Sequence, residues 1–145
     1  MTFQITELGP GEAGVAATAL LALRPHFGDA EAVAARAEEQ RSAGYRLAAV
    51  IVPGEPDAPA VAGFRIARNL AWGRHLYVDD LSTLPEARGH GYGAALMDWL
   101  IERARTEGCA ELHLDSGVGP ERESAHRLYF GSRLRIASYH FTRVL

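Results

Sequence analysis

The sequence has a single cysteine, no lysine and no long hydrophobic run. Cys109 has no second cysteine with which to form an internal disulfide or a CxxC metal pair, so we interpret it as a buried thiol rather than a nucleophile. No apolar stretch reaches the ~18 residues that span a bilayer, and residues 1–10 lack the basic and apolar regions of a signal peptide. We therefore expect a soluble, cytoplasmic protein with no membrane partner.

The chain also lacks an excess of basic charge. Its formal net charge is -3, and acidic residues are mixed with the 15 basic residues, all arginine. This pattern favours neither a nucleic-acid partner nor a polyanion-binding tail. The histidines are scattered without ligand spacing such as HxxxH, so we expect no metal site. With 145 residues, 48% of them hydrophobic and 23% charged, the chain is predicted to form one globular domain over residues 1–145.

Strand-like and helix-like patterns follow one another along the chain. We predict strands at residues 3–8, 45–52, 60–68, 75–81, 111–116 and 134–145, and helices at 12–23, 29–42, 93–107 and 121–130. Asp29 is the predicted N-cap of the second helix, and Gly108 the C′ residue of the third. The helix at 93–107 crosses between two strands, which must then be parallel, whereas hairpins make the earlier strands antiparallel. The prediction is an α/β fold (mixed α+β) with a sheet of six or seven strands and about four helices.

The glycine-rich segment 88–93, Arg-Gly-His-Gly-Tyr-Gly, lies between a predicted strand and a predicted helix. Glycines allow the backbone to approach an anion closely, and the first turn of a helix offers free N–H groups at the positive end of its dipole. Arg88 adds a charge for a contact with a phosphate. The segment therefore indicates a pyrophosphate-binding site.

Two nucleotide-binding motifs are alternatives for this segment. A Walker A loop needs a lysine and is excluded. The dinucleotide pattern GxGxxA is matched by Gly89, Gly91 and Ala94, with Asp115 about 20 residues further on. Against it, residues 82–87, with Pro85 among them, separate the glycines from the strand, and the 30 residues after Asp115 leave room for only one helix and one or two strands.

The motif Arg88-x-x-Gly91-x-Gly93 resembles the (Q/R)xxGx(G/A) signature of the GCN5-related N-acetyltransferases (GNAT). Residues 78–86, Val-Asp-Asp-Leu-Ser-Thr-Leu-Pro-Glu, resemble the strand and turn before that signature. Residues 125–130, Ala-His-Arg-Leu-Tyr-Phe, are similar to the A-x-x-(F/L)-Y pattern of a later helix in the family. The predicted order of elements also agrees with this family over essentially the whole chain.

The resemblance implies a cofactor site for acetyl-CoA, with no metal. Backbone N–H groups would hold the pyrophosphate, main-chain groups would pair with the pantetheine arm like an added strand, and the two parallel strands would splay to admit the thioester. The implied cofactor-binding residues are Leu81, Ser82, Thr83, Arg88, Gly89, His90, Gly91, Tyr92, Gly93 and Ala94.

The implied reaction is direct transfer of the acetyl group to a primary amine of a small molecule or peptide. It needs a neutral amine, stabilisation of an oxyanion by backbone N–H groups near Leu81, and a proton for the departing thiolate. Tyr129 is the candidate general acid. Asp79 and Asp80 are the candidate bases; we expect them to point to opposite faces of their strand, so that one faces the amine.

Several points stay open at this stage. Arg122 stands where many family members carry an asparagine, and Gly131 is followed by Ser132 rather than phenylalanine. The acceptor pocket is expected near residues 23–28, including His26, near residues 69–74 and near the C-terminal strand. A homodimer through that strand or an open sheet edge is plausible. The alternatives to an enzyme are a non-catalytic acyl-CoA sensor of the same fold and the dinucleotide-binding domain.

Overall fold

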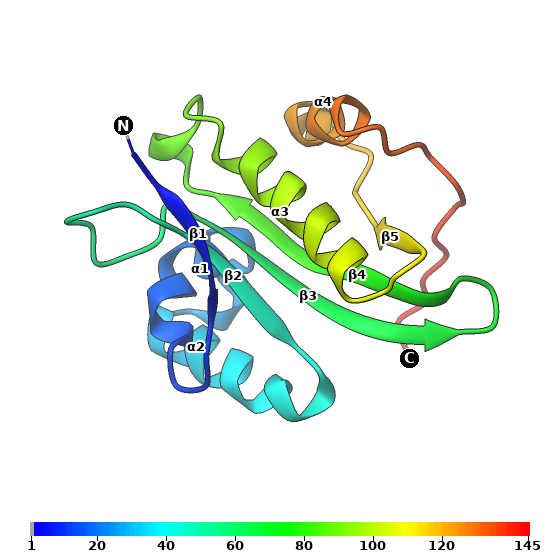
Figure 1. Cartoon of the computed structure of the whole chain (residues 1–145). Coiled ribbons are helices and arrows are strands. Elements are labelled where there is room, and N and C mark those ends of the chain that lie inside the picture. The colour runs from blue at the N-terminus through cyan, green and yellow to red at the C-terminus, as the bar shows by residue number, and fades with distance from the viewer. Residues whose placement is uncertain (1) are drawn as a thin grey trace.

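The computed structural model describes residues 2–145 and shows one mixed sheet (Figure 1). Its five strands are β1 (Gln4–Leu8), β2 (Arg46–Ile51), β3 (Ala60–Asn69), β4 (Gly73–Thr83) and β5 (Glu111–Leu114), arranged in the order of their numbers. The first four strands are antiparallel, and β4 pairs with β5 in parallel. The mixed α/β sheet is confirmed, but the predicted six or seven strands are wrong, because within residues 2–145 the sheet has five.

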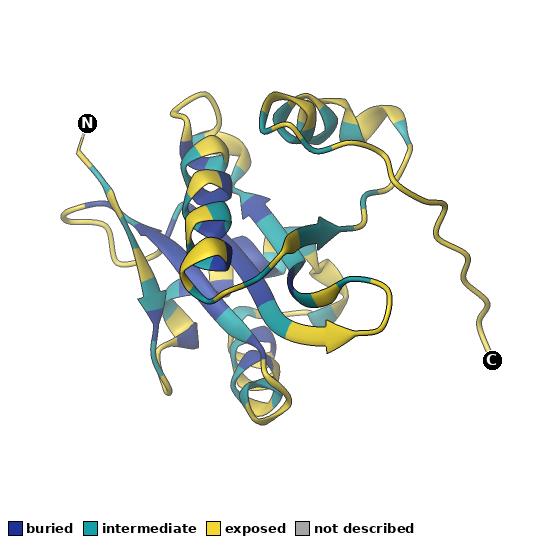
Figure 2. Cartoon of the chain, turned by 45° about the vertical axis from the view of Figure 1, so that its right-hand side comes forward, coloured by how far each residue is buried: buried dark blue, intermediate teal, exposed yellow. Residues whose placement is uncertain are grey.

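Helices cover both faces of this sheet. Helices α1 (Ala17–Leu23) and α2 (Ala30–Glu39) pack against one face, over a core that includes Leu20, Leu47 and Val61. Helix α3 (Tyr92–Thr106) packs against the other face, over a core that includes Phe64 and Leu100. The side chains of a strand alternate between its two faces, so both cores draw on β2 and β3. Figure 2 shows the resulting buried layer on each side of the central strands.

The predicted helix signals are present in the structure. The Asp29 carboxylate accepts a hydrogen bond of 2.8 Å from the N–H of Ala32, which makes it the N-cap of α2. Helix α3 ends at Thr106, and Gly108 follows with φ of 75°. The helix at 121–130 is α4 (Glu123–Gly131). Of the helices in residues 2–145, none is long and apolar enough to cross a membrane.

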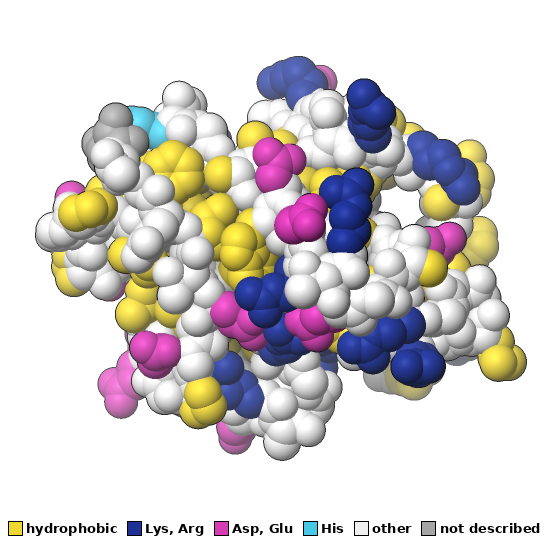
Figure 3. Space-filling view, in the orientation of Figure 1, with side chains coloured by type: hydrophobic (Ala, Val, Ile, Leu, Met, Phe, Trp, Pro, Cys, Tyr) yellow, Lys and Arg dark blue, Asp and Glu magenta, His cyan; other side chains and the backbone are white. Residues whose placement is uncertain are grey.

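A network of partly buried ion pairs joins α3 to β1 and β2. The guanidinium of Arg46 lies 2.8 Å from the Glu7 carboxylate and 2.7 Å from that of Glu107. Arg103 also reaches Glu7, at 2.6 Å. Figure 3 shows acidic and basic side chains meeting across the middle of this face. The network holds the C-terminal end of α3 against the sheet, so the N-terminal end of the helix is set next to the end of β4.

The predicted C-terminal strand at 134–145 is wrong, since this segment forms no strand in the structure. Arg133 adopts a left-handed conformation with φ of 66° and closes α4. The N–H of Leu134 donates to the carbonyl of Tyr129, and the N–H of Arg133 donates to that of Phe130, which is the Schellman pattern. After this turn the chain does not rejoin the sheet within residues 2–145. The tail, which we define as residues 135–145, is exposed throughout (Figure 2).

Candidate active site

The parallel strands β4 and β5 separate halfway along β4. Their pairing runs from His75 opposite Glu111 to Val78 opposite Leu114, whereas β4 continues to Thr83. The edge of β4 from Asp79 onward therefore has no strand partner on the β5 side within residues 2–145. A cavity of about 250 Å³ opens at this point, lined by Leu23, Arg24, Val78, Asp79, Asp80, Leu81, Leu114, Asp115, Gly117, Arg122 and Tyr129.

A β-bulge places both aspartates on the same side of the sheet. Gly63 pairs with Asp80 and the next residue, Phe64, pairs with Val78, so Asp79 is the extra residue on β4. Both carboxylates bond groups on the α1/α2 side, Asp79 through Arg65 and Asp80 through Tyr45 and Arg24. The expectation that the two point to opposite faces is wrong, because the bulge interrupts the alternation of the strand.

Asp79 sits in a position suited to accept a proton. Its Oδ2 accepts a bond of 2.8 Å from Nε of Arg65, which also donates to the side chain of Gln40 and to the carbonyl of Ala43. Burial raises the pKa of Asp79 above its ordinary value, and the neighbouring Arg65 only partly opposes this rise. A carboxylate with a raised pKa is a stronger base than an exposed aspartate.

Both oxygens of Asp80 are already engaged. Oδ1 accepts a bond of 2.9 Å from Nε of Arg24, and Oδ2 accepts one of 2.7 Å from the Tyr45 hydroxyl. Burial and the adjacent Asp80 raise the pKa of Tyr45, so the hydroxyl keeps its proton and acts as a donor. A Cβ on Gly63 would lie 2.0 Å from that hydroxyl, so only glycine leaves room for it. Asp80 is thus a fixed anchor for Arg24 and Tyr45.

Tyr129 lines the same cavity as Asp79 and Asp80. It comes from α4, while the aspartates come from β4, so the β4–β5 opening brings the two together. Burial raises the pKa of Tyr129, an effect that the neighbouring Arg122 guanidinium partly opposes. The hydroxyl is therefore protonated at neutral pH. Nε of Arg122 is buried and has no hydrogen-bond partner among residues 2–145, although it lines the same cavity.

The glycine-rich segment forms the N-terminal end of α3. Gly89 and Gly91 have φ of 85° and 79°, conformations that favour glycine, and no side chain caps the helix. The first helical bond runs from the N–H of Ala95 to the carbonyl of Gly91. Within residues 2–145, the N–H groups of Gly93 and Ala94 make no backbone hydrogen bond, so they remain available to an anion.

The other predicted cofactor residues lie around this helix end. Leu81 lines the cavity, and the Thr83 hydroxyl lies close to Gly93. Ser82 is buried instead, and its hydroxyl donates to the carbonyl of Ala19 on α1 at 2.7 Å, so its side chain has a packing role. His90 and Arg88 are exposed in the loop, and the His90 ring stacks on Tyr92 at 5.4 Å.

A second cavity of about 480 Å³ opens on the α1/α2 side of the same aspartates. It is lined by Leu20, Arg24, His26, Phe27, Val33, Arg36, Ala37, Gln40, Tyr45, Tyr77, Asp79 and Asp80. Segment 23–28 supplies part of this wall, including His26, as expected, but neither segment 69–74 nor the C-terminal residues do. Asp79, Asp80 and Arg24 line both cavities. In the described part of the chain, no group of three or more His, Cys, Asp or Glu residues could hold a metal ion.

The arrangement agrees with the comparison to known families. A sequence model of the acetyltransferase (GNAT) family matches residues 16–131, which include α1 to α4 and exclude the tail. The chain belongs to the GNAT acetyltransferase family. The family resemblance drawn from the glycine-rich segment is thereby confirmed.

Two curated relatives match the chain over shorter stretches. The bovine (Bos taurus) thialysine N-epsilon-acetyltransferase is 37% identical over 65 residues, or 43% of this chain and 38% of that protein. The uncharacterized N-acetyltransferase YhdJ of Bacillus subtilis (strain 168) is 40% identical over 57 residues, or 39% of each protein. The chain thus matches about two fifths of the length of these GNAT relatives.

Solved GNAT structures share the fold over nearly the whole chain. The aminoglycoside N-acetyltransferase AAC(6')-Iy, in complex with CoA, aligns with a TM-score of 0.82 at 15% identity, covering 99% of this chain and 95% of that one. The ribosomal-protein-alanine N-acetyltransferase of Brucella melitensis biovar Abortus 2308 aligns with a TM-score of 0.78 at 20% identity, covering 99% and 98%. At these identities the likeness shows the fold alone.

Four further residues contact the predicted site residues, although the sequence did not predict a role for them there. Arg65 and Tyr45 hold the two aspartates, Arg24 bridges Asp80 to the main-chain carbonyl of Asp79, and Arg122 lies beside Tyr129. Arg122 alone carried a signal, since it departs from the asparagine common at that family position. The others come from distant segments, and nothing in their local sequence marks them.

Proposed function

We propose that this GNAT chain transfers the acetyl group of acetyl-CoA to a primary amine of a small molecule or peptide. The observation that carries the proposal is the cavity at the opening between β4 and β5, which both Asp79 and Tyr129 line. One relative is named as an N-acetyltransferase of thialysine, and two structural neighbours are named as N-acetyltransferases of ribosomal-protein alanine and of aminoglycosides. The second cavity, which shares Asp79, provides room for such an amine.

The residues present fit acetyl-CoA. The N–H groups of Gly93 and Ala94 are placed to bind the pyrophosphate, with the exposed Arg88 beside them. The edge of β4 from Asp79 to Thr83 lacks a partner on the β5 side within residues 2–145 and can pair with the amide groups of the pantetheine arm. Arg122 lines the same cavity, and its Nε, buried and without a partner within residues 2–145, is a candidate donor to the ligand.

When bound, acetyl-CoA supplies a thioester whose carbonyl carbon accepts the amine. Asp79 takes the proton that the amine loses, because its raised pKa makes it an effective base. Tyr129 gives its proton to the departing sulfur, and the Arg122 charge stabilises the phenolate that this leaves. The turnover is complete when Tyr129 has regained a proton and Asp79 has released the one that it accepted. Asp80 positions Arg24 and Tyr45 around Asp79.

The test separates catalysis from binding. We expect Tyr129→Phe to bind acetyl-CoA with unchanged affinity and to lose roughly 10²–10⁴-fold in kcat, since the phenol acts only as the acid. Tyr139→Phe, on the exposed tail, is the matched control and should keep full activity. Binding is measured by calorimetry and turnover by release of free CoA with a panel of amines. Unchanged turnover in Tyr129→Phe would remove Tyr129 from its role.

A pH profile tests the base. We expect kcat/KM to fall on the acid side at a pH above the ordinary pKa of an aspartate, because burial raises the pKa of Asp79. Asp79→Asn should abolish this limb together with most activity, and Asp98→Asn, exposed on α3, should leave the profile intact. Binding of acetyl-CoA without turnover of any amine would instead favour the acyl-CoA sensor, and binding of NADH alone would favour the dinucleotide-binding domain.

A further inference from the structure

The second cavity, on the α1/α2 side of the sheet, is lined by charged side chains that differ in exposure. The Asp79 and Asp80 side chains are only 23% and 14% exposed, and each accepts a hydrogen bond from a guanidinium, of Arg65 and of Arg24 respectively. We call this part of the wall the inner end. Two positive charges balance its two negative ones, which suits an amine that must be neutral when it attacks the thioester.

Arg36 carries a positive charge at the outer, more exposed end of the same cavity. Its side chain lines the cavity but is 58% exposed, and its one ion pair within residues 2–145 joins Nε to Oε2 of Glu39 at 2.9 Å. Glu39 is 72% exposed and does not line the cavity. An exposed pair of this kind contributes little, and a guanidinium has five N–H donors. Arg36 is therefore available to an anionic group of a ligand in the cavity.

Helix α2 sets the distance between the two ends. Four residues of α2 and its C-cap line the cavity at the spacing of one helix face: Val33, Arg36, Ala37 and Gln40. Gln40 belongs to the inner end, because its Oε1 accepts a bond of 2.7 Å from the same Arg65 that bonds Asp79. Arg36 lies four residues earlier, which is about 6 Å along the helix axis. A ligand that reaches both ends needs two polar groups separated by a comparable distance.

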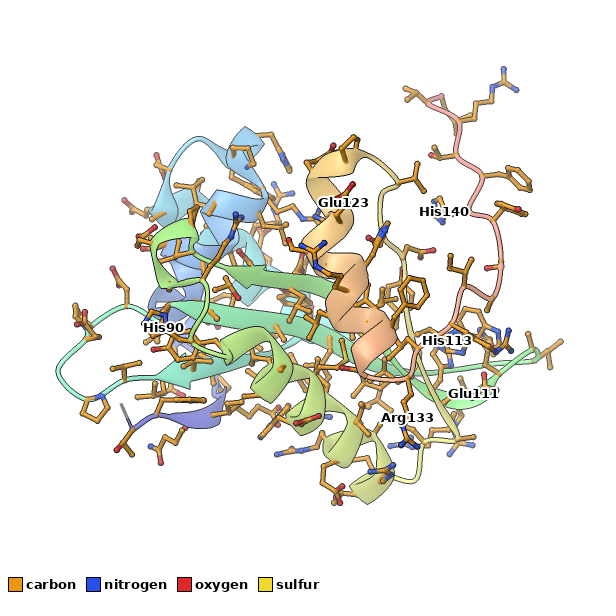
Figure 4. The ribbon with its side chains drawn as sticks, turned by 90° about the horizontal axis from the view of Figure 1, so that it is seen from above. His90, Glu111, His113, Glu123, Arg133 and His140 are labelled. Carbon is orange, nitrogen blue, oxygen red and sulfur yellow. The ribbon has the colours of Figure 1, made fainter. Side chains whose placement is uncertain are left out.

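The remaining wall along α1 and α2 is largely apolar. It consists of Leu20, Phe27, Val33 and Ala37, and Figure 4 shows this helix pair on the side of the sheet opposite α3. An apolar wall favours methylene groups and offers no partner to a polar spacer. In an α-amino acid the amine and the carboxyl carbon are joined by two bonds of only about 1.5 Å each, so such a molecule is too short to reach both ends.

We propose that the acceptor is an ω-amino acid, in which several methylene groups separate a primary amine from a carboxylate; this proposal rests on the proposed function. The amine reaches Asp79, the methylene groups lie along the apolar wall, and the carboxylate pairs with Arg36. A diamine or polyamine is disfavoured, because its second ammonium group would meet the guanidinium of Arg36. Arg36 is thereby the residue that determines which class of amine is accepted.

The first test compares three amines that share the same spacer and differ only in the far group. These are ε-aminocaproate with a carboxylate, ε-aminocaproamide with a neutral amide, and cadaverine with a second ammonium. We expect kcat/KM, measured by CoA release, to be about fivefold higher for the carboxylate than for the amide, which is the effect of an exposed ion pair, and lowest for cadaverine. Equal values for the three amines, or a preference for cadaverine, would overturn the proposal.

The second test assigns the preference to Arg36. Arg36→Gln should abolish the preference for ε-aminocaproate over its amide, and Arg36→Glu should invert the order so that cadaverine becomes the best of the three. Arg68→Gln is the matched control, because Arg68 is exposed on β3, lines neither cavity and loses the same charge. A preference that survives in Arg36→Gln contradicts the role of this residue.

Binding measurements distinguish a failure of this proposal from a failure of the proposed function. Calorimetry of the same three amines with the CoA-saturated protein gives their dissociation constants without any turnover, and we expect the same order. If the amines bind in this order but none is acetylated, the proposed function fails and the ligand class stands. If all three are acetylated and bound equally well, the function stands and the ligand class is wrong. If none binds and none is acetylated, both proposals are contradicted.

Discussion

Residues 2–114 and residues 115–145 are equally rich in large apolar side chains, but they differ in what covers them. In the first region α1 and α2 cover one face of the sheet and α3 covers the other, so Phe64 and Leu100 are fully buried. In the second region α4 has no buried residue and Phe141 is almost fully exposed. Apolar composition therefore does not decide burial in this molecule; the presence of a packed neighbour does.

The candidate active site lies at the border between the two regions. Asp79 belongs to the packed sheet, and Tyr129 belongs to α4. The packed region can hold a carboxylate with a raised pKa, because the surrounding core and Arg65 keep it in place. The less packed region carries Tyr129, the proposed acid. The contrast leads to four predictions, taken from the largest expected effect to the smallest.

Phe64→Ala should have the largest effect on stability. Phe64 is fully buried against α3, and its ring meets that of Trp99 at 5.7 Å. Removing a buried phenylalanine costs about 3–5 kcal/mol of unfolding free energy. Leu70→Ala, at a fully exposed position of the β3–β4 turn, should change it by less than about 0.5 kcal/mol. Urea unfolding measures both, and equal losses would contradict the packing described for the sheet.

Gly63→Ala should cost about 1–3 kcal/mol, because the new methyl group would overlap the Tyr45 ring. Displacing Tyr45 also breaks its bond to Asp80, so kcat should fall together with stability. Gly14→Ala, where a Cβ has open space, is the control and should be neutral. Unfolding experiments give the change in stability, and CoA release from the same samples gives the change in kcat. Full activity in Gly63→Ala would show that Asp80 does not need Tyr45.

A fall in pH should lower the free energy of unfolding, because Glu107 becomes protonated. Arg46 lowers the pKa of Glu107 below its ordinary value of 4.5. The stabilisation is therefore present above pH 4.5 and is lost as the pH falls through the lower pKa of the folded state. Glu107→Gln should remove about 1 kcal/mol at pH 7 and flatten the acid limb of the stability curve. Glu102→Gln, an exposed residue of α3, should keep the wild-type curve.

Arg133→Gly should have the smallest effect on the free energy of unfolding, and it should raise this free energy rather than lower it. Arg133 has φ of 66°, a conformation that costs a residue with a Cβ about 1–2 kcal/mol and costs glycine little. The extra flexibility of glycine in the unfolded chain offsets part of this gain, which leaves about 0.5–1 kcal/mol. Arg135→Gly, outside the turn, should give no gain. A loss of stability in Arg133→Gly would show that the Arg133 side chain has contacts that outweigh its backbone strain.

Much of the fold follows from short stretches of the sequence. The cap at Asp29, the helix end at Gly108 and the apolar run of residues 46–51 each depend on neighbours along the chain. The glycine-rich segment at the start of α3 is of the same kind, because its conformation requires glycine at Gly89 and Gly91. Local signals of this type predict element limits and an anion site, and they led to the correct family.

Other features were decided only by contacts between distant segments. A bulge opposite Gly63 turned Asp79 and Asp80 to one side, although strict alternation had separated them. The separation of β5 from β4 brought Arg122 and Tyr129 to the aspartates. Residues 134–145 have the apolar content of a strand, yet a strand exists only where a second strand completes its hydrogen bonds, and within residues 2–145 none does so for this segment. The sequence alone determined which segments tend to form helices and strands; the tertiary structure decided which of them meet, because pairing depends on the path of the whole chain.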